Sequence, residues 1–232
     1  MNFELLFQLL LNGLIVGTLY GVVAMCFVLI YKSTQIVNFA QGEFLLIGAW
    51  VCYAFLVEMH MPFWMGFLFT LLFMMVFGIV LQMVVLRPMI GEPIISVIMV
   101  TIGLSIFFQA ATKWIFGATT ATYPQVFETR SVNLLGMQIE TAYIMSFVIS
   151  LFIMAGFYWF FKYSKLGLAM RATAFDQQVA QSLGISVKTV FAMSWAISAL
   201  VSGVAGIVIG MVNGVSSALS VIGIKVFPAV IL

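Results

Sequence analysis

The sequence has 232 residues, of which 64% are hydrophobic and only 7% are charged. Soluble domains carry about 25% charged residues, so this chain cannot cover its own surface with groups that water solvates. A soluble fold is therefore excluded, and we expect lipid to be the solvent. The formal net charge of +2 is too small to support a nucleic-acid partner.

Long apolar runs divide the chain into membrane spans. A hydrocarbon core of about 30 Å needs roughly 20 apolar residues per helix. Continuous runs of this length favour helices over a β-barrel, whose strands would show short alternating segments. No basic segment precedes the first run, so we predict a retained span rather than a cleaved signal peptide.

The predicted fold class is all-α, a polytopic transmembrane bundle of about seven spans. The predicted spans are 5–30, 42–58, 63–86, 94–116, 141–161 and 190–212, followed by one that begins near 219. This last run is still apolar at Leu232, where the sequence stops. We therefore expect residues 1–232 to form a single transmembrane domain that is truncated at its C-terminus.

Basic residues predict the orientation of the bundle. With the N-terminus outside, the internal connections hold six basic residues and the external connections hold two. The internal residues are Lys32, Arg87, Lys162, Lys165, Arg171 and Lys188, and the external ones are Lys113 and Arg130. This distribution follows the positive-inside tendency. The polar segment 117–140 is then external, and the segment 162–189 is internal.

Small residues recur at intervals of four in two spans. The first span contains Gly13, Gly17 and Gly21, and the sixth contains Ser198, Ser202, Gly206, Gly210 and Gly214. Residues at this spacing share one helix face and let helix backbones approach closely. We expect tight packing within this chain; the alternative is that these faces meet a second membrane subunit or line a pathway.

Polar residues cluster where the second span should enter the membrane. The cluster is Asn38, Phe39, Ala40, Gln41, Gly42 and Glu43. The helix macrodipole favours a carboxylate in a first turn, so Glu43 is compatible with a helix that starts at the membrane surface. The alternative is a broken or re-entrant start, whose irregular backbone faces protein or water. The residues alone leave both interpretations open.

The internal segment 162–189 is predicted to contain one short amphipathic helix. Its apolar positions recur at helical spacing: Leu168, Ala172, Phe175, Val179 and Leu183. Gly184 is a natural C-terminal stop, and Ser186 can cap the next helix. Such a helix either lies on the inner membrane surface or docks into a groove on a cytoplasmic protein. Composition leaves these two alternatives open.

Two motifs together resemble those of permease subunits of the branched-chain amino acid (hydrophobic amino acid uptake) family of ABC transporters. The first is a Ser-x-x-Gly-x-Ala-x-Arg-Ala run followed by Asp and by Leu-Gly-Ile. Its counterparts here are Ser164, Gly167, Ala169, Arg171, Ala172, Asp176, Leu183, Gly184 and Ile185. The second is an Asn-Phe-Ala-His/Gln-Gly-Glu run, which matches residues 38–43 with Gln at position 41. The resemblance covers essentially the whole chain.

The resemblance implies a permease subunit of an ATP-driven, binding-protein-dependent importer of branched-chain or other small amino acids in the cell (inner) membrane. It implies a second related permease, two cytoplasmic ATP-binding subunits that hold ATP and Mg, and an external solute-binding protein as partners. The first motif, with Lys165 and Phe175, would then couple the spans to the ATPases, and residues 38–43 would belong to the pathway. A urea or short-amide permease of the same family is an alternative.

Other function classes have little support in the sequence. An ion-coupled secondary transporter needs intramembrane ionisable groups, for which Glu43 and Lys225 are the only candidates. No enzyme and no cofactor are expected in this chain, because it has no phosphate-binding loop, no H-E-x-x-H and no G-x-S-x-G. We expect His60 at the surface and Cys26 and Cys52 as core-packing thiols.

Overall fold

The computed structural model of the protein describes residues 3–124, 131–134 and 137–231. Within these residues, six helices are long and apolar enough to cross a membrane, and a seventh apolar helix is shorter. The six spans are Gln8–Thr34, Gln41–Glu58, Phe63–Met89, Ile94–Phe116, Thr141–Tyr163 and Val187–Asn213. The predicted all-α polytopic bundle is confirmed, and each predicted span overlaps an observed one.

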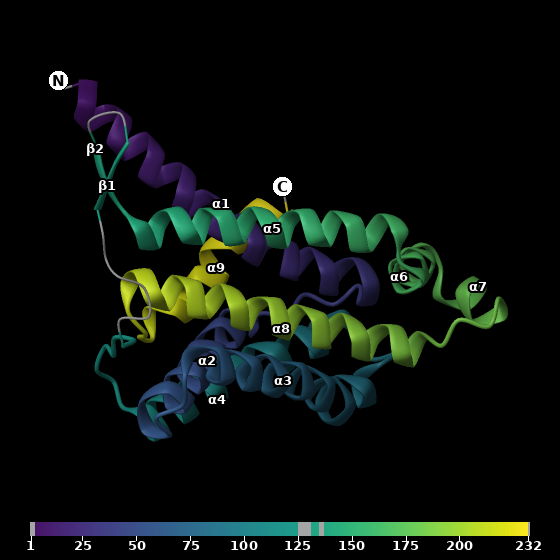
Figure 1. Ribbon diagram of the computed structural model, residues 1–232. Coiled ribbons are helices and arrows are strands. Elements are labelled where there is room, and N and C mark those ends of the chain that lie inside the picture. Colours follow the sequence, from purple (N-terminus) through teal and green to yellow (C-terminus); the bar gives the residue numbers. More distant parts are fainter. Residues whose placement is uncertain (1–2, 125–130, 135–136, 232) are drawn as a thin grey trace.

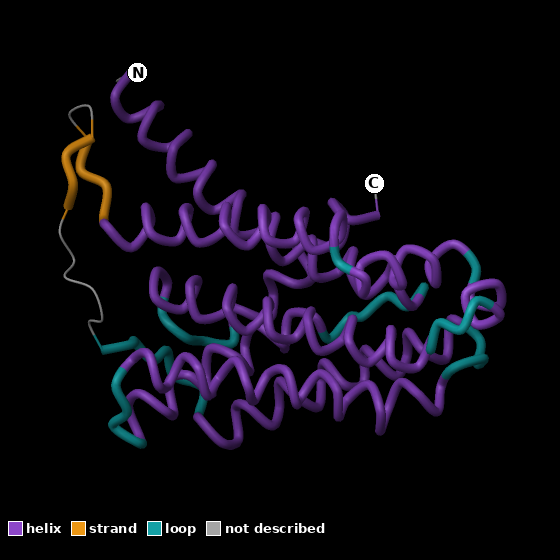
Figure 2. Tube along the Cα trace, turned by 45° about the vertical axis from the view of Figure 1, so that its right-hand side comes forward, coloured by secondary structure: helices purple, strands orange, loops and turns teal. Residues whose placement is uncertain are grey.

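The spans correspond to α1 (Phe3–Thr34), α2 (Gln41–Tyr53), α3 (Phe63–Leu81), α4 (Ile94–Phe116), α5 (Thr141–Tyr163) and α8 (Val187–Asn213). The helix α2 continues as the π-helical turn η1 (Ala54–Glu58), and α3 continues through η2 (Gln82–Leu86) and η3 (Arg87–Met89). The shorter helix α9 is Ala218–Ile231. A short hairpin of β1 (Ser131–Leu134) and β2 (Met137–Glu140) precedes α5 and lies near the N-terminus (Figures 1 and 2).

The helix α8 forms the centre of the bundle. It packs against α1, α2 and α3, and it lies between α1 with α5 on one side and α2 with α3 on the other (Figure 1). An added Cβ at Gly206 would lie within 3.0 Å of the backbone of Leu45, and one at Gly48 would lie that close to the backbone of Gly203. Because lipid supplies no hydrophobic drive between spans, close backbone approach through small residues holds α2 and α8 together.

The internal segment contains two helices instead of the predicted one: α6 (Lys165–Phe175) and α7 (Gln177–Ser182). Asp176 has extended backbone angles, and its side chain accepts hydrogen bonds from the backbone N–H groups of Gln178 and Val179. It therefore ends α6 and caps α7, as a short carboxylate side chain does at a helix N-terminus. The prediction of one continuous helix is wrong because Asp176 competes for the backbone donors.

The ends of these two helices follow the predicted signals. The hydroxyl of Ser164 accepts a hydrogen bond from the N–H of Gly167 at 2.8 Å and caps α6. Gly184 has a φ of +83°, which suits glycine and ends α7. The hydroxyl of Ser186 accepts from the N–H of Thr189 at the start of α8. Both helices project from the end of the bundle opposite β1 and β2 (Figure 1).

The start of the polar segment 117–140 folds back against the bundle. Ala121 and Val215 exchange two backbone hydrogen bonds of 2.9 and 2.7 Å. The hydroxyl of Tyr123 donates to the carbonyl of Ala49 in α2 at 2.7 Å. Burial raises the pKa of Tyr123 well above its usual value, so the hydroxyl stays protonated and acts as a donor. Arg130, predicted here as an external charge, lies outside the described residues.

Candidate functional site

A buried polar cluster surrounds the start of α2. The chain leaves α1 through residues 35–40, and α2 then begins at Gln41. The Oδ1 of Asn38 accepts a hydrogen bond from the N–H of Ala40, and its Nδ2 donates to Oε1 of Gln41 at 3.2 Å. Asn38 and Gln41 have no solvent exposure. The non-helical backbone before α2 is thus enclosed by protein. Such backbone would be unstable in contact with lipid, which cannot satisfy its polar groups.

The central helix α8 completes this cluster. The Nε2 of Gln41 donates to the hydroxyl of Ser202, and the hydroxyl of Ser198 lies 3.3 Å from Oε1 of Gln41. Ser198 also donates to the carbonyl of Cys26 in α1 at 3.2 Å. The three helices α1, α2 and α8 therefore share one hydrogen-bonded network. Each of its amide and hydroxyl groups has a partner, as buried polar groups require.

Glu43 occupies the first turn of α2 and is only 2% exposed. Its Oε1 accepts a hydrogen bond from the hydroxyl of Ser105 in α4 at 3.1 Å. Its Oε2 is buried and has no hydrogen-bond partner. The N-terminal end of α2 favours a negative charge at this position. A carboxylate with one free oxygen is nevertheless costly inside a membrane protein, which makes it a candidate functional group.

A polar stripe runs along α4 toward α2 and α9. It consists of Thr101, Ser105, Gln109 and Lys113, at intervals of four. The hydroxyl of Thr101 lies 3.3 Å from the carbonyl of Val37, and the Nε2 of Gln109 donates to the hydroxyl of Ser220 at 3.1 Å. The period-four spacing of polar residues in an otherwise apolar span was the signal for this stripe. The stripe was not among the features predicted from the sequence.

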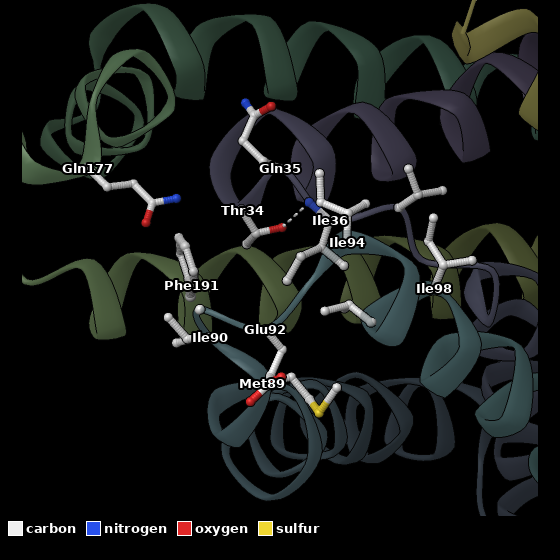
Figure 3. Close-up of a pocket in the computed structure, with 13 residues that line it drawn as sticks. Thr34, Gln35, Ile36, Met89, Ile90, Glu92, Ile94, Ile98, Gln177 and Phe191 are labelled. Carbon is white, nitrogen blue, oxygen red and sulfur yellow. Dashed lines mark hydrogen bonds between the residues drawn. The ribbon is translucent and has the colours of Figure 1, made fainter.

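A cavity of about 130 Å³ opens next to this cluster, at the end of the bundle that carries α6 and α7. The residues that line it come from the end of α1, the connection to α2, the turn before α4, and α7 and α8. Figure 3 shows Gln177 of α7 and Phe191 of α8 on one side, and Ile36 and Ile94 on the other. The dashed line marks the hydrogen bond from the N–H of Ile36 to the hydroxyl of Thr34. The cavity thus lies between α7 and the chain that leads to Asn38.

The predicted small-residue faces differ in what they contact. Added Cβ atoms at Gly206 and Gly210 would meet neighbouring groups within 3.0 Å, and Ser202 is fully buried. In contrast, an added Cβ at Gly13 or Gly17 would meet nothing within 4 Å, and one at Gly21 would reach only Met154 at 4.0 Å. The expectation that Gly13 and Gly17 pack within this chain is therefore wrong. The opposite face of this part of α1 is the buried one, through Ile15 and Leu19.

The internal helices have one buried and one exposed face. Gly167, Met170 and Thr173 are buried against the bundle. An added Cβ at Gly167 would lie 2.7 Å from the carbonyl oxygen of Phe160, so α6 packs directly on the end of α5. The exposed face contains large apolar side chains: Leu168, Phe175, Val179 and Leu183. Phe175 is 95% exposed and Leu183 is 75% exposed, so this chain alone leaves both of them uncovered.

The remaining coupling residues predicted from the sequence lie around this face. Lys165 and Arg171 are exposed, Ala169, Ala172 and Ile185 are partly buried, and Asp176 and Gly184 form the helix boundaries. His60 and Lys225 are both exposed, as expected for the histidine. Cys26 and Cys52 are buried, which confirms that prediction.

The arrangement offers hydrogen-bond donors and acceptors that suit a small polar solute. The described helices enclose amide, hydroxyl and carboxylate groups at the start of α2, with a cavity beside them and an exposed apolar surface outside. Among the described residues, no group of three or more His, Cys, Asp or Glu side chains could hold a metal ion.

Comparisons with known proteins identify the family. Residues 9–232 match the family model described as branched-chain amino acid transport system / permease component. The high-affinity branched-chain amino acid transport system permease protein BraD of Pseudomonas aeruginosa is 30% identical, over 97% of this chain and 78% of that protein. The corresponding LivH protein of Escherichia coli K12 is 27% identical, with the same two coverages.

A more distant relative is a probable branched-chain amino acid transport permease protein LivH from Methanocaldococcus jannaschii. It is 24% identical over 86% of this chain and 65% of that protein. No solved structure matches the chain significantly. The family match covers the described bundle from Leu9 in α1 to α9, including the polar cluster and the α6–α7 segment. The chain belongs to the family of permease components of branched-chain amino acid transport systems.

Proposed function

We propose that this membrane permease subunit serves an ATP-driven importer of branched-chain amino acids. The named relatives are permeases for these substrates, which supports the substrate class. ATP and Mg would be bound by two separate cytoplasmic subunits. A second related permease would complete the pathway, and an external binding protein would deliver the solute. The inner membrane is the location that this assembly requires.

The observation that carries the proposal is the exposed apolar face of α6 and α7. Phe175, Val179 and Leu183 lie on short helices outside the spans, and the rest of the described chain leaves them exposed. Large exposed apolar patches with polar neighbours are typical of protein–protein contact sites. An apolar helix face that fits a groove on a partner is a common recognition mode. We assign this face to the contact with the ATP-binding subunits.

The same helices offer a route for mechanical coupling. The buried side of α6 is packed on the end of α5 through Gly167. Gln177, the first residue of α7, lines the cavity beside the connection to α2. A displacement of α6 and α7 by a motor would therefore move one wall of that cavity. This supports a mechanism in which ATPase closure and reopening change access to the polar cluster.

The positive-inside tendency supports a cytoplasmic position for the α6–α7 end. Lys165, Arg171 and Lys188 all belong to this end of the bundle. The N-terminus and the β1–β2 hairpin would then be external. The test uses a protein with the substitutions Cys26→Ala, Cys52→Ala and Phe175→Cys. A membrane-impermeant thiol reagent applied to intact cells should leave its single thiol unlabelled.

Uptake by the assembled complex in proteoliposomes tests the proposal. Phe175→Ala should abolish ATP-dependent uptake of radiolabelled leucine, because the ring is the most exposed apolar group on the face. Phe152→Ala removes a similar ring from the lipid-facing side of α5, where Phe152 is 74% exposed, and should leave uptake unchanged. Uptake of urea but not leucine would favour the amide permease. Uptake driven by an ion gradient without ATP would favour a secondary transporter and overturn the proposal.

A further inference from the structure

Glu43 is exceptional among the charged residues of the chain. Among the residues whose burial the structure describes, it is the only charged side chain that is buried, and all the others are exposed. Three buried polar side-chain atoms in the described chain lack a hydrogen-bond partner, and Glu43 Oε2 is the only one that belongs to an ionisable group. Packing of the bundle therefore leaves one acidic oxygen unsatisfied at the start of α2.

No cation among the residues that the structure describes satisfies that oxygen. Lys113 is the basic residue that acts on Glu43 electrostatically, but it lies two turns beyond Ser105 on α4. The eight residues from Ser105 to Lys113 correspond to about 12 Å along the helix axis. The Nζ of Lys113 instead lies 3.4 Å from Oε1 of Gln109. An ionised carboxylate removed from water needs a close cation or several donors. Glu43 accepts one hydrogen bond, from Ser105, and the other hydroxyl beside it, that of Ser220, donates to the carbonyl of Ser217.

We propose that Glu43 binds the ammonium group of the transported amino acid and that Gln109 binds its carboxylate. The inference rests on the proposed function, because it assumes that the solute is an amino acid. Oε2 of Glu43 is the free acceptor for the ammonium group. The Nε2 of Gln109 donates to the neutral hydroxyl of Ser220, and a substrate carboxylate is a stronger acceptor than a hydroxyl.

The geometry brings these groups to one place. Ser105 and Gln109 are one turn apart on α4, so they lie on the same helix face. An added Cβ at Gly42 would lie within 3.0 Å of the backbone of Ser220, and one at Gly223 would lie 2.5 Å from the backbone nitrogen of Gly42. The start of α9 is thus pressed against the first turn of α2. This contact sets Ser220, the partner of Gln109, beside Glu43.

The described conformation encloses the site, so a substrate reaches it only when a neighbouring helix moves. The helix α4 is suited to this movement, because only 11% of its most apolar stretch is buried within the chain, the lowest share of the six spans. Recognition through the shared ammonium and carboxylate groups would not depend on the side chain of the amino acid. A neutral amide such as urea would gain nothing from the Glu43 carboxylate.

Binding of radiolabelled L-leucine to the complex of permeases and ATP-binding subunits, prepared in lipid nanodiscs without the external binding protein, tests the inference. Glu43→Gln should weaken leucine binding at least about tenfold, as expected for loss of a charge-assisted hydrogen bond. Glu58→Gln neutralises an exposed carboxylate at the other end of the same span and should bind leucine as the wild type does. Gln109→Ala should weaken leucine binding and leave binding of isoamylamine, which has no carboxylate, unchanged.

Competition in the unmodified complex gives a second readout that does not depend on folding of a variant. Isoamylamine should displace leucine, because it keeps the ammonium group, and isocaproate, which lacks that group, should not. Equal leucine binding by Glu43→Gln and wild type, or displacement by isocaproate but not by isoamylamine, overturns the role of Glu43. ATP-driven leucine uptake in that case would leave the proposed function intact. Import of urea without leucine would instead refute the proposed function itself.

Discussion

The helices α8 and α4 are both long apolar spans of almost the same mean hydropathy, yet their environments differ. In α8, 72% of the most apolar stretch is buried within the chain, against 11% in α4. The helix α8 has serine and glycine at intervals of four and is surrounded by α1, α2 and α3. The helix α4 has large exposed side chains such as Ile106 and Phe107. In lipid, small residues rather than hydropathy decide which span becomes the centre of a bundle.

The difference extends to the polar groups on the two helices. Ser198 and Ser202 of α8 bond to Gln41 in a network whose members all have partners. Ser105 of α4 bonds to a carboxylate that keeps one free oxygen. We therefore interpret the polar groups of α8 as structural and those of α4 as part of the pathway. The following variants test this distinction.

The largest effect is expected from Gly206→Leu. Its side chain would collide with the backbone of Leu45, which cannot move aside as a flexible side chain can. Overpacking of this kind should cost about 3 kcal/mol or more and should prevent recovery of folded, monodisperse protein in detergent. Gly103→Leu in α4 is the matched control, since nothing lies within 4 Å of an added Cβ there. Equal loss of folded protein for both variants would remove the distinction between the helices.

The two faces of α6 should differ next most strongly. Met170 is 1% exposed, so Met170→Ala should destabilise the protein by about 2–5 kcal/mol through the cavity that it leaves. Phe175→Ala, on the uncovered face, should change stability by no more than about 0.5 kcal/mol. Thermal unfolding of the purified chain in detergent measures both. A large loss of stability in Phe175→Ala would mean that the ring packs inside this chain and is not free for a partner.

A smaller difference is expected between two serines. Ser202→Ala leaves the buried amide of Gln41 without its acceptor and should cost about 1–3 kcal/mol. Ser105→Ala should cost less than about 1 kcal/mol, because the sparsely buried α4 can move and let water replace the hydroxyl that donates to Glu43. The same unfolding assay compares them. If Ser105→Ala were the more destabilising, the polar stripe of α4 would be structural.

A small effect, no larger than the difference between the two serines, is expected from Tyr123→Phe. This variant removes the hydrogen bond to the carbonyl of Ala49 and keeps the ring, so it should cost about 1 kcal/mol. Limited proteolysis should then cut segment 117–124 faster than in the wild type, because its attachment to α2 is weaker. An unchanged cleavage rate would mean that the two backbone bonds of Ala121 suffice to hold this segment.

The spans were predictable because long apolar runs with polar ends leave few alternatives in lipid. The caps Ser164 and Ser186 and the stop at Gly184 were also predictable, since each acts on its nearest backbone groups. The break at Asp176 was not, because the apolar spacing continues across it and conceals the competing cap.

Long-range features could not be predicted with the same success. Gly13, Gly17 and Gly206 occur in equivalent sequence patterns, but only Gly206 has a neighbouring backbone. The partner of a small-residue face depends on how helices far apart in the chain are arranged, which local spacing does not encode. For the same reason, the bond from Ser105 to Glu43 was missed, although residues 38–43 were recognised as unusual.

ATP-driven import by this permease requires that α6 and α7 bind a nucleotide-hydrolysing subunit. Purification of the tagged chain from its native membranes, with a parallel preparation of Phe175→Asp, tests it most directly. We predict that the wild-type chain retains a second permease together with ATP-hydrolysing subunits, and that Phe175→Asp keeps the permease but loses the ATPase activity. A wild-type complex without ATP hydrolysis, or a Phe175→Asp complex that retains it in full, would contradict the account.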